Sequence, residues 1–237
     1  MKILGIDSSG TVASVALVDD DITIAEYTVN FKKTHSETLL PMIDEIVRMT
    51  ETDPCTIEAI AVAAGPGSFT GLRIGSSTAK GLGMAYEIPI IPVPTCHALA
   101  YNVWTANDTI ICPIMDARRN QVYTGIYKFE AGKLVVLQDQ MAVDIKDLLA
   151  ILSTYSQGVV FVGDGVPVYQ EEIKRVMGER AVFAPLSCNA QRASCVAAAA
   201  MRYVKEGKIM HYSELLPVYL RKPQAERELE EKQKGDL

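Results

Sequence analysis

The sequence predicts a duplicated α/β fold in which two halves each follow the order βββαβαβα. Three observations predict it. The same order of strand-like and helix-like segments occurs in residues 1–106 and again in residues 107–222. The first strand of each half ends on an acidic residue before a tight turn, Asp7 in one half and Asp116 in the other. With 49% hydrophobic and 22% charged residues, a chain of 237 residues can bury a sizeable core.

The first half opens with a β-meander, because three runs rich in Ile and Val are joined by short polar turns at residues 2–7, 11–18 and 22–29. A helix over 35–50 follows. It is opened by Thr34 with Glu37 three residues later, a pair that satisfies two backbone amides at a helix start. The remaining elements are a strand, a helix, a strand and a helix at 57–63, 71–86, 88–93 and 95–104.

The second half repeats this order with strands at 109–115, 121–129 and 133–138, a helix at 145–155, a strand at 159–162, a helix at 168–177, a strand at 181–183 and an Ala-rich helix at 190–205. Each half should therefore form a mixed sheet with an antiparallel meander at its edge and parallel crossovers. Residues 223–237 are nearly all polar and predict a solvated tail.

Composition narrows the function. The formal net charge is −6, which argues against a surface built mainly to bind phosphate backbones and leaves Lys32-Lys33 and Arg118-Arg119 as the local basic patches. Charged residues interrupt the N-terminal apolar run, and no run of about 18 apolar residues follows, so we expect a cytoplasmic protein without a membrane segment. The five cysteines form no C-x-x-C pair and the three histidines lie far apart, so no metal or other cofactor is expected.

A strand, a tight Ser/Gly turn and a second strand, duplicated with an acidic residue after each first strand, resemble the layout of the sugar kinase, Hsp70 and actin superfamily. The resemblance implies that turn amides cradle phosphate and that two carboxylates face each other across a cleft to hold a hydrated cation. The candidate cleft residues are Asp7, Ser8, Ser9, Asp116, Gly163 and Asp164. The alternative is that these Asp and Gly residues simply end their strands.

The glycine-rich loop at 65–71 precedes a helix but does not match a phosphate loop, because Leu72-Arg73 follow where Lys-Ser or Lys-Thr would be needed. The helix behind it carries small residues every fourth position, at Gly71, Gly75, Ala79 and Gly83. Interior glycines cost about 1 kcal/mol each in helix propensity, so a close approach by another element must offset them. That element is either this protein's own sheet or a partner helix.

The first helix also has an apolar face that is wider than one buried stripe needs, since its apolar residues cover about half of the helix circumference. The two helices together predict a partner interface with these candidate contacts: Leu39, Ile43, Ile46, Leu72, Gly75, Ala79 and Gly83.

Seven motifs identify a family: residues 5–9 (GIDSS), 35–41 (HSETLLP), 64–75 (AGPGSFTGLRIG), 79–82 (AKGL), 115–119 (MDARR), 163–165 (GDG) and 217–221 (PVYLR). They closely resemble the TsaB (YeaZ) family, a glycoprotease-like branch of the superfamily above, over nearly the whole chain. The resemblance implies an actin-like ATPase (RNase H-like, ASKHA) fold and a role in making threonylcarbamoyladenosine beside the anticodon of tRNA. It further implies pairing through a helical bundle with the related TsaD, which carries the catalytic metal, and work with the ATPase TsaE. A second copy of the chain would compete with TsaD for the same surface, so the isolated chain is expected to be a homodimer.

The chain departs from the catalytic relative at one place. TsaD-like proteins carry an H-x-x-x-H metal pair where this sequence has Thr95 and Leu99. His97 lies between them and supplies one ligand, whereas catalytic zinc or iron sites usually need about three from the protein. The sequence therefore predicts a non-catalytic scaffold or activating subunit that meets tRNA only through the complex. The alternative is a stand-alone ATPase or phosphotransferase that uses Asp7, Asp116 and the hairpin turn. A third alternative, a metallopeptidase, would need more metal ligands than the sequence pattern provides.

Overall fold

A computed structural model describes residues 1–31, 33–105 and 108–221. Its first sheet contains β1 (Lys2–Asp7), β2 (Ala13–Asp19), β3 (Ile22–Val29), β4 (Ala59–Gly65) and β5 (Ile90–Pro94), in the order β3-β2-β1-β4-β5. Its second sheet contains β6 (Ile110–Asp116), β7 (Gln121–Glu130), β8 (Lys133–Asp144), β9 (Val159–Val162) and β10 (Ala181–Phe183), in the order β10-β9-β6-β7-β8. Read from the meander edge, both sheets have the same topology, which confirms the predicted duplication.

The register explains the mixed character of each sheet. In both halves the first strand pairs antiparallel with the second and parallel with the fourth, as β1 does with β2 and β4 and β6 does with β7 and β9. Every residue of β4 is buried, and its sequence is apolar throughout because helices cover both of its faces.

The described residues contain six α-helices: α1 (His35–Met49), α2 (Phe69–Tyr86), α3 (Thr95–Ala100), α4 (Ile145–Ser153), α5 (Val166–Met177) and α6 (Ala193–Lys205). The predicted cap of α1 is confirmed. The backbone N–H of Thr34 donates to Glu37 Oε2 at 3.0 Å, and the Thr34 side chain accepts a hydrogen bond from the Glu37 backbone N–H. The helix continues through Pro41. The helix predicted at 95–104 is shorter and ends at Ala100, whereas β8 runs six residues beyond its predicted end at Gln138.

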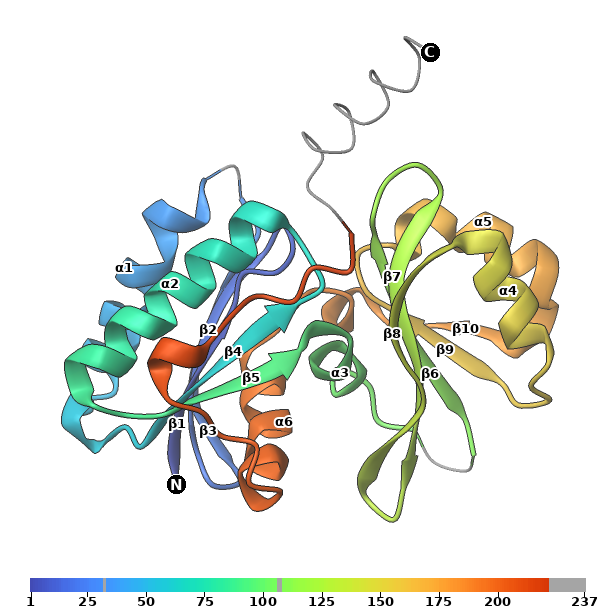
Figure 1. The fold of residues 1–237 in the computed structure, drawn as a ribbon. Coiled ribbons are helices and arrows are strands. Elements are labelled where there is room, and N and C mark those ends of the chain that lie inside the picture. Colours follow the sequence, from blue (N-terminus) through green and yellow to red (C-terminus); the bar gives the residue numbers. More distant parts are fainter. Residues whose placement is uncertain (32, 106–107, 222–237) are drawn as a thin grey trace, which may run out of the picture.

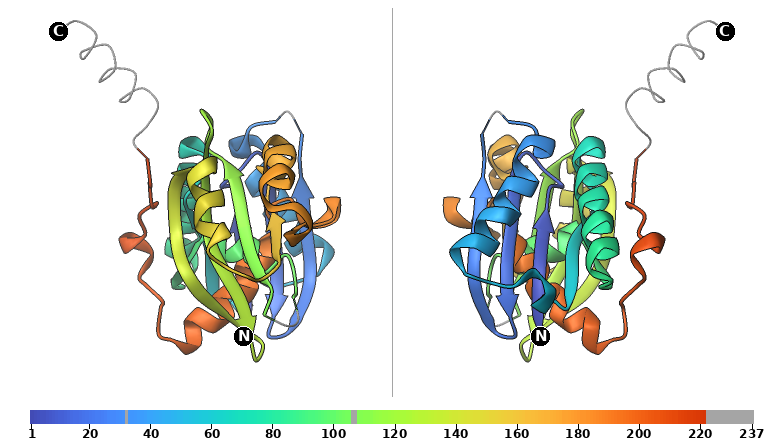
Figure 2. Two further views of the ribbon diagram at one scale, coloured as in Figure 1. Left: turned by 90° about the vertical axis from the view of Figure 1, so that its right-hand side faces the viewer. Right: turned by 90° about the vertical axis from the view of Figure 1, so that its left-hand side faces the viewer.

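Helices cover both faces of each sheet (Figures 1 and 2). One apolar core joins α1 and α2 to one face of the first sheet, and a second joins α6 to its other face. In the second sheet, α4 and α5 pack on one face while α3 approaches the other. Figure 1 shows α3 between the two lobes. We call β1–β5 with α1, α2 and α6 the first lobe, and β6–β10 with α4 and α5 the second lobe.

The position of α6 corrects the predicted division of the chain. The range 107–222 assigned α6 to the second half, but its buried face packs on β1, β2, β4 and β5 of the first lobe. The order of elements repeats along the chain, but the last helix of the second half packs on the sheet of the first lobe. The boundary at 106/107, the polar tail at 223–237 and Lys32 lie outside the described residues.

Residues 215–221 form an extended segment, the C-terminal strap, that crosses from the first lobe to the second. The backbone N–H of Val218 donates to Ala64 O at 2.7 Å, and the Arg221 guanidinium donates to Ala117 O. Gly65 has φ +116°, and a Cβ there would clash with Val218 O, so glycine is needed where the strap passes β4. Among the described residues, no helix is long and apolar enough to span a bilayer.

Candidate functional site

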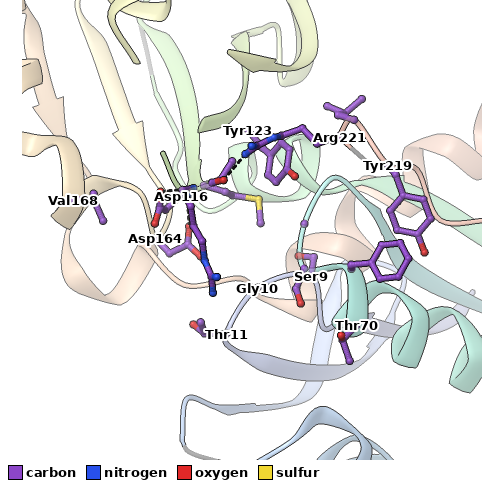
Figure 3. Close-up of a pocket in the computed structure, with 17 residues that line it drawn as sticks. Ser9, Gly10, Thr11, Thr70, Asp116, Tyr123, Asp164, Val168, Tyr219 and Arg221 are labelled. Carbon is purple, nitrogen blue, oxygen red and sulfur yellow. Dashed lines mark hydrogen bonds between the residues drawn. The ribbon is translucent and has the colours of Figure 1, made fainter. Parts of the chain in front are cut away.

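A cleft of about 850 Å³ separates the lobes. Figure 3 shows Asp116, Asp164 and Val168 on one side and Ser9, Thr70 and Tyr219 on the other. The lining comes from the β1–β2 turn, the start of α2, the β6–β7 turn, the loop after β9 and the strap. Parallel strands that end at the same edge of each sheet thus bring these loops together.

Asp7, the first predicted carboxylate, lies beneath the cleft and does not line it. It is 1% exposed, and its Oδ1 accepts hydrogen bonds from the Ser9 backbone N–H at 2.9 Å and from Ser9 Oγ at 2.6 Å. Oδ2 has no partner. Burial raises the pKa of Asp7 to about 6, and the bonds from Ser9 oppose this shift. The carboxylate therefore carries a costly charge near neutral pH.

The Ser8–Gly10 turn is held by the first lobe itself. Ser8 Oγ donates to Gly71 O at 2.9 Å, Ser9 O accepts the Ser68 N–H at 2.7 Å, and Gly10 O pairs with His35 Nε2 at 2.9 Å. Of the two predicted serines, Ser9 lines the cleft, whereas Ser8 is buried against α2. The turn is therefore fixed by neighbouring helices.

In the second lobe, Asp116 is exposed and lines the cleft, but its Oδ1 already accepts the Arg118 N–H at 2.9 Å and the Tyr169 hydroxyl at 3.1 Å. Asp164 lines the cleft beside it and accepts the Asp116 N–H at 3.2 Å. Burial raises the pKa of Asp164. Gly163, with φ +116°, has no room for a side chain against Ile114 O, so it shapes the loop.

The structure thus brings Ser9, Asp116 and Asp164 to the cleft surface and places Asp7, Ser8 and Gly163 behind it. In the described part of the chain, no group of three His, Cys, Asp or Glu side chains is placed to hold a metal ion. Only the second lobe places carboxylates in the described cleft, those of Asp116 and Asp164. Both carboxylates already accept hydrogen bonds from backbone N–H groups of the neighbouring turn.

Thr95 and Leu99, where the family resemblance leads us to expect the counterpart of a metal pair, lie on α3. Both are buried in the core. His97 Nδ1 pairs with the Tyr203 hydroxyl, and its Nε2 lies 3.6 Å from Asp139 Oδ1. Burial lowers the pKa of His97, although the Asp139 carboxylate opposes this shift. His97 therefore joins α3 to α6 and β8, and its surroundings provide no second imidazole.

The contacts predicted on α1 and α2 are buried within the chain, although Ile43 also lines a groove between the two helices. Ala79 is 0% exposed, and the other residues are buried as well: Leu39, Ile43, Ile46, Leu72, Gly75 and Gly83. The small-residue face of α2 packs inside its own lobe, because a Cβ on Gly71 or Gly75 would clash with Ser8 and one on Gly83 would crowd Tyr212. The protein's own sheet and turn therefore account for the glycines.

An apolar groove of about 280 Å³ remains open between α1 and α2. Leu40 and Val47 of α1 line it opposite Leu82 and Tyr86 of α2, and Ile43 reaches its floor. Leu40 is 54% exposed, and Tyr86 on α2 is 39% exposed. These helices do present an apolar surface, which includes the predicted Ile43 but otherwise consists of residues that were not predicted.

Sequence reasoning also missed an aromatic contact at the cleft mouth. The ring centroids of Phe69, at the start of α2, and Tyr219, on the strap, are 4.7 Å apart, and the Arg73 guanidinium lies 3.9 Å from the Phe69 centroid. Both aromatic residues line the cleft. They fall within two quoted motifs, but nothing in a sequence separation of about 150 residues signals their contact.

The profile of the family described as TsaD, tRNA N6-adenosine threonylcarbamoyltransferase, matches residues 24–229. The chain is 35% identical to the tRNA threonylcarbamoyladenosine biosynthesis protein TsaB of Bacillus subtilis over 99% of this chain and 100% of that protein. The structure of YeaZ from Pseudomonas aeruginosa superposes with a TM-score of 0.77 at 25% identity, covering 92% of this chain and 99% of the other. A ROK hexokinase from Thermus thermophilus, at 13% identity and TM-score 0.50 over 87% of this chain and 100% of the other, shares the fold alone.

Two lobes of identical topology around a cleft, shared with a sugar kinase, define a protein of the actin-like ATPase fold. Within that class, the chain belongs to the TsaB (YeaZ) family, because the similarity extends over its whole length at 35% identity.

Proposed function

We propose that this chain is a non-catalytic scaffold or activating subunit of the complex that transfers a threonylcarbamoyl group to the adenosine beside the anticodon of tRNA. The observation that carries the proposal is full-length similarity to a protein named for threonylcarbamoyladenosine biosynthesis, joined with the burial of Thr95 and Leu99 where the catalytic relative has its metal pair. Two side chains sealed in the core and lacking imidazoles cannot form that site.

The partner in this proposal is a TsaD-type paralogue, with TsaE as the ATPase of the complex. The groove between α1 and α2 supports a protein interface, since exposed Leu40 and Tyr86 line an apolar hollow and hot spots typically fill such hollows. Because the paralogue shares this fold, a second copy of the chain would compete for the groove and give a homodimer when the chain is alone. We place this assembly in the cytoplasm.

In this proposal, tRNA reaches the chain only through the complex, in keeping with a net charge of −6. The alternative, a stand-alone ATPase or phosphotransferase, has less support. Its two carboxylates are Asp7, which lies buried beneath the cleft, and Asp116, which is engaged by its own turn.

Reconstitution with purified components tests the proposal. Threonylcarbamoyladenosine formation is measured on unmodified tRNA with the paralogue, TsaE, ATP and a threonylcarbamoyl donor, with and without this chain. We expect no product from the chain alone, and product from the full set that falls at least about 10-fold when the chain is omitted. Multiple turnovers of ATP by the lone chain would refute the assignment in favour of the alternative.

A further inference from the structure

Three planar groups form a layered surface at the cleft mouth, which we call the aromatic shelf: Phe69, Arg73 and Tyr219. The two rings lie 4.7 Å apart at an interplanar angle of 35°. Arg73, one helical turn after Phe69, places its guanidinium 3.9 Å from the Phe69 centroid and donates through Nε to the Tyr219 hydroxyl at 3.4 Å. Tyr219 is nevertheless 39% exposed. The shelf is thus held in place while part of one ring stays open to the cleft.

A cation faces the cleft from the other lobe. Arg118 lies on the β6–β7 turn, lines the cleft and is exposed. No hydrogen bond or ion pair with another described residue engages its guanidinium, whereas its backbone N–H is fixed by Asp116 Oδ1 at 2.9 Å. A single phosphate in the cleft would find this side chain available.

The backbone of this turn is strained. Arg118, Arg119 and Asn120 have φ angles of 62°, 56° and 60°, a left-handed conformation that glycine adopts far more easily than arginine. Bonds from the Gln121 N–H to Arg118 O and from the Ile145 N–H to Asn120 O hold the turn in place. Arg118 also lines the cleft, so keeping an arginine where glycine would be less strained points to a use for its side chain there.

The carboxylates of the cleft limit the charge of the ligand. Asp116 and Asp164 both line the cleft, so they would repel a polyphosphate more strongly than a single phosphate. A ligand with one planar ring and one phosphate keeps this repulsion small. A volume of about 850 Å³ is within the range that holds such a group.

We infer that the mouth of the cleft binds one nucleotide of an RNA strand, with its base on the Tyr219 ring and its phosphate toward Arg118. The inference rests on the proposed function, since the strand would be the tRNA on which the complex acts. Aromatic–base stacking supplies affinity without reading sequence, and the arginine positions the backbone. The chain then contributes to RNA affinity within the complex without binding tRNA tightly when alone.

The test measures tRNA affinity of the assembled complex by fluorescence anisotropy at several salt concentrations. Tyr219→Ala should weaken binding at least about 5-fold, the lower end of the loss seen when a stacked aromatic is removed. Tyr219→Phe, which keeps the ring, should stay within about 2-fold. Arg118→Ala should flatten the salt dependence by about one unit of slope. Size-exclusion chromatography of each variant complex shows whether assembly is intact, which separates this inference from the proposed function.

A second measurement does not depend on the variants. Photo-crosslinking of 4-thiouridine-substituted tRNA to the wild-type complex, followed by peptide mapping, should mark the peptide that contains Tyr219 or the peptide that contains Phe69. Unchanged affinity of an intact Tyr219→Ala complex, or crosslinks only elsewhere, would overturn the inference. Protection of Tyr219 from chemical modification by ATP with Mg²⁺, but not by tRNA, would also overturn the inference, since the cleft would then be a free-nucleotide site.

Discussion

At the residue scale, Asp7 is the least expected feature, because a carboxylate chosen as a candidate cation ligand proves to be buried with one oxygen unpartnered. Its folded-state pKa of about 6 lies above its ordinary value of 3.8 because of burial. The folded protein therefore holds this proton more tightly than the unfolded chain does. The stabilisation from the protonated form is complete below about pH 4 and is lost as the pH rises through about 6.

Asp7→Asn should remove this pH dependence, since the amide oxygen can still accept both bonds from Ser9. Relative to wild type, the variant should gain about 3 kcal/mol of unfolding free energy between pH 4 and pH 7, as a shift of about two pKa units implies. Urea denaturation at several pH values provides the measurement. A stability difference that stays constant over this range would show that Asp7 ionises normally.

Residue identity alone also could not locate the shelf or the buried side of α1. Periodicity indicated that both first helices are apolar over a wide arc, but it could not decide which apolar residue meets the sheet. Leu39 is buried and Leu40 exposed although they are adjacent and identical. The contact between Phe69 and Tyr219 forms only because the strap returns across the cleft, a tertiary event that short-range patterns do not encode.

At the element scale, α2 shows how much local pattern predicts. Its existence, the strands on either side and the capped start of α1 all follow from periodicity and capping residues, and the structure bears them out. The glycines were predicted as sites of close approach by the protein's own sheet or by a partner helix. In the structure the neighbour of Gly71 and Gly75 is Ser8 in the β1–β2 turn, and that of Gly83 is Tyr212. Likewise, the Ala-rich pattern of α6 predicts a buried helix but not the sheet that buries it.

Replacing either of two glycines of α2 by alanine should change the stability of the fold, in opposite directions. A Cβ on Gly81 would meet nothing within 4 Å, so Gly81→Ala should stabilise the fold by about 0.5–1 kcal/mol through helix propensity. A Cβ on Gly75 would clash with Ser8 Oγ and disturb its bond to Gly71 O, so Gly75→Ala should cost about 1–3 kcal/mol. Thermal melting compares the two, and a shift of the same sign in both would contradict this packing.

At the scale of the whole molecule, the lobes are joined by α3, by a hydrogen bond from Arg202 of α6 to Leu134 O and by the strap, while an apolar groove stays open between α1 and α2. This arrangement places the cleft and the proposed partner groove on different parts of the surface. Either can then be altered without the other.

Arginine substitutions on α2 should separate packing from partner contact. Ala79→Arg should destabilise the chain by more than about 3 kcal/mol, because Ala79 is fully buried and the new charge has no partner there. Tyr86→Arg should leave the chain folded yet fail to co-elute with the paralogue, because Tyr86 is exposed and lines the groove. Co-elution of a well-folded Tyr86→Arg chain would place the interface elsewhere.

The chain is proposed to act through a partner and not through its own carboxylates. Threonylcarbamoyladenosine formation by the reconstituted complex tests this most directly, with the chain carrying either Asp7→Asn or Leu40→Asp. We expect Asp7→Asn to retain product formation within about 2-fold of wild type at pH 7. We expect Leu40→Asp, with a charge in the apolar groove, to lose partner binding and product formation together while remaining folded. Loss of product with Asp7→Asn in an intact complex, and full activity with Leu40→Asp, would contradict the proposed role.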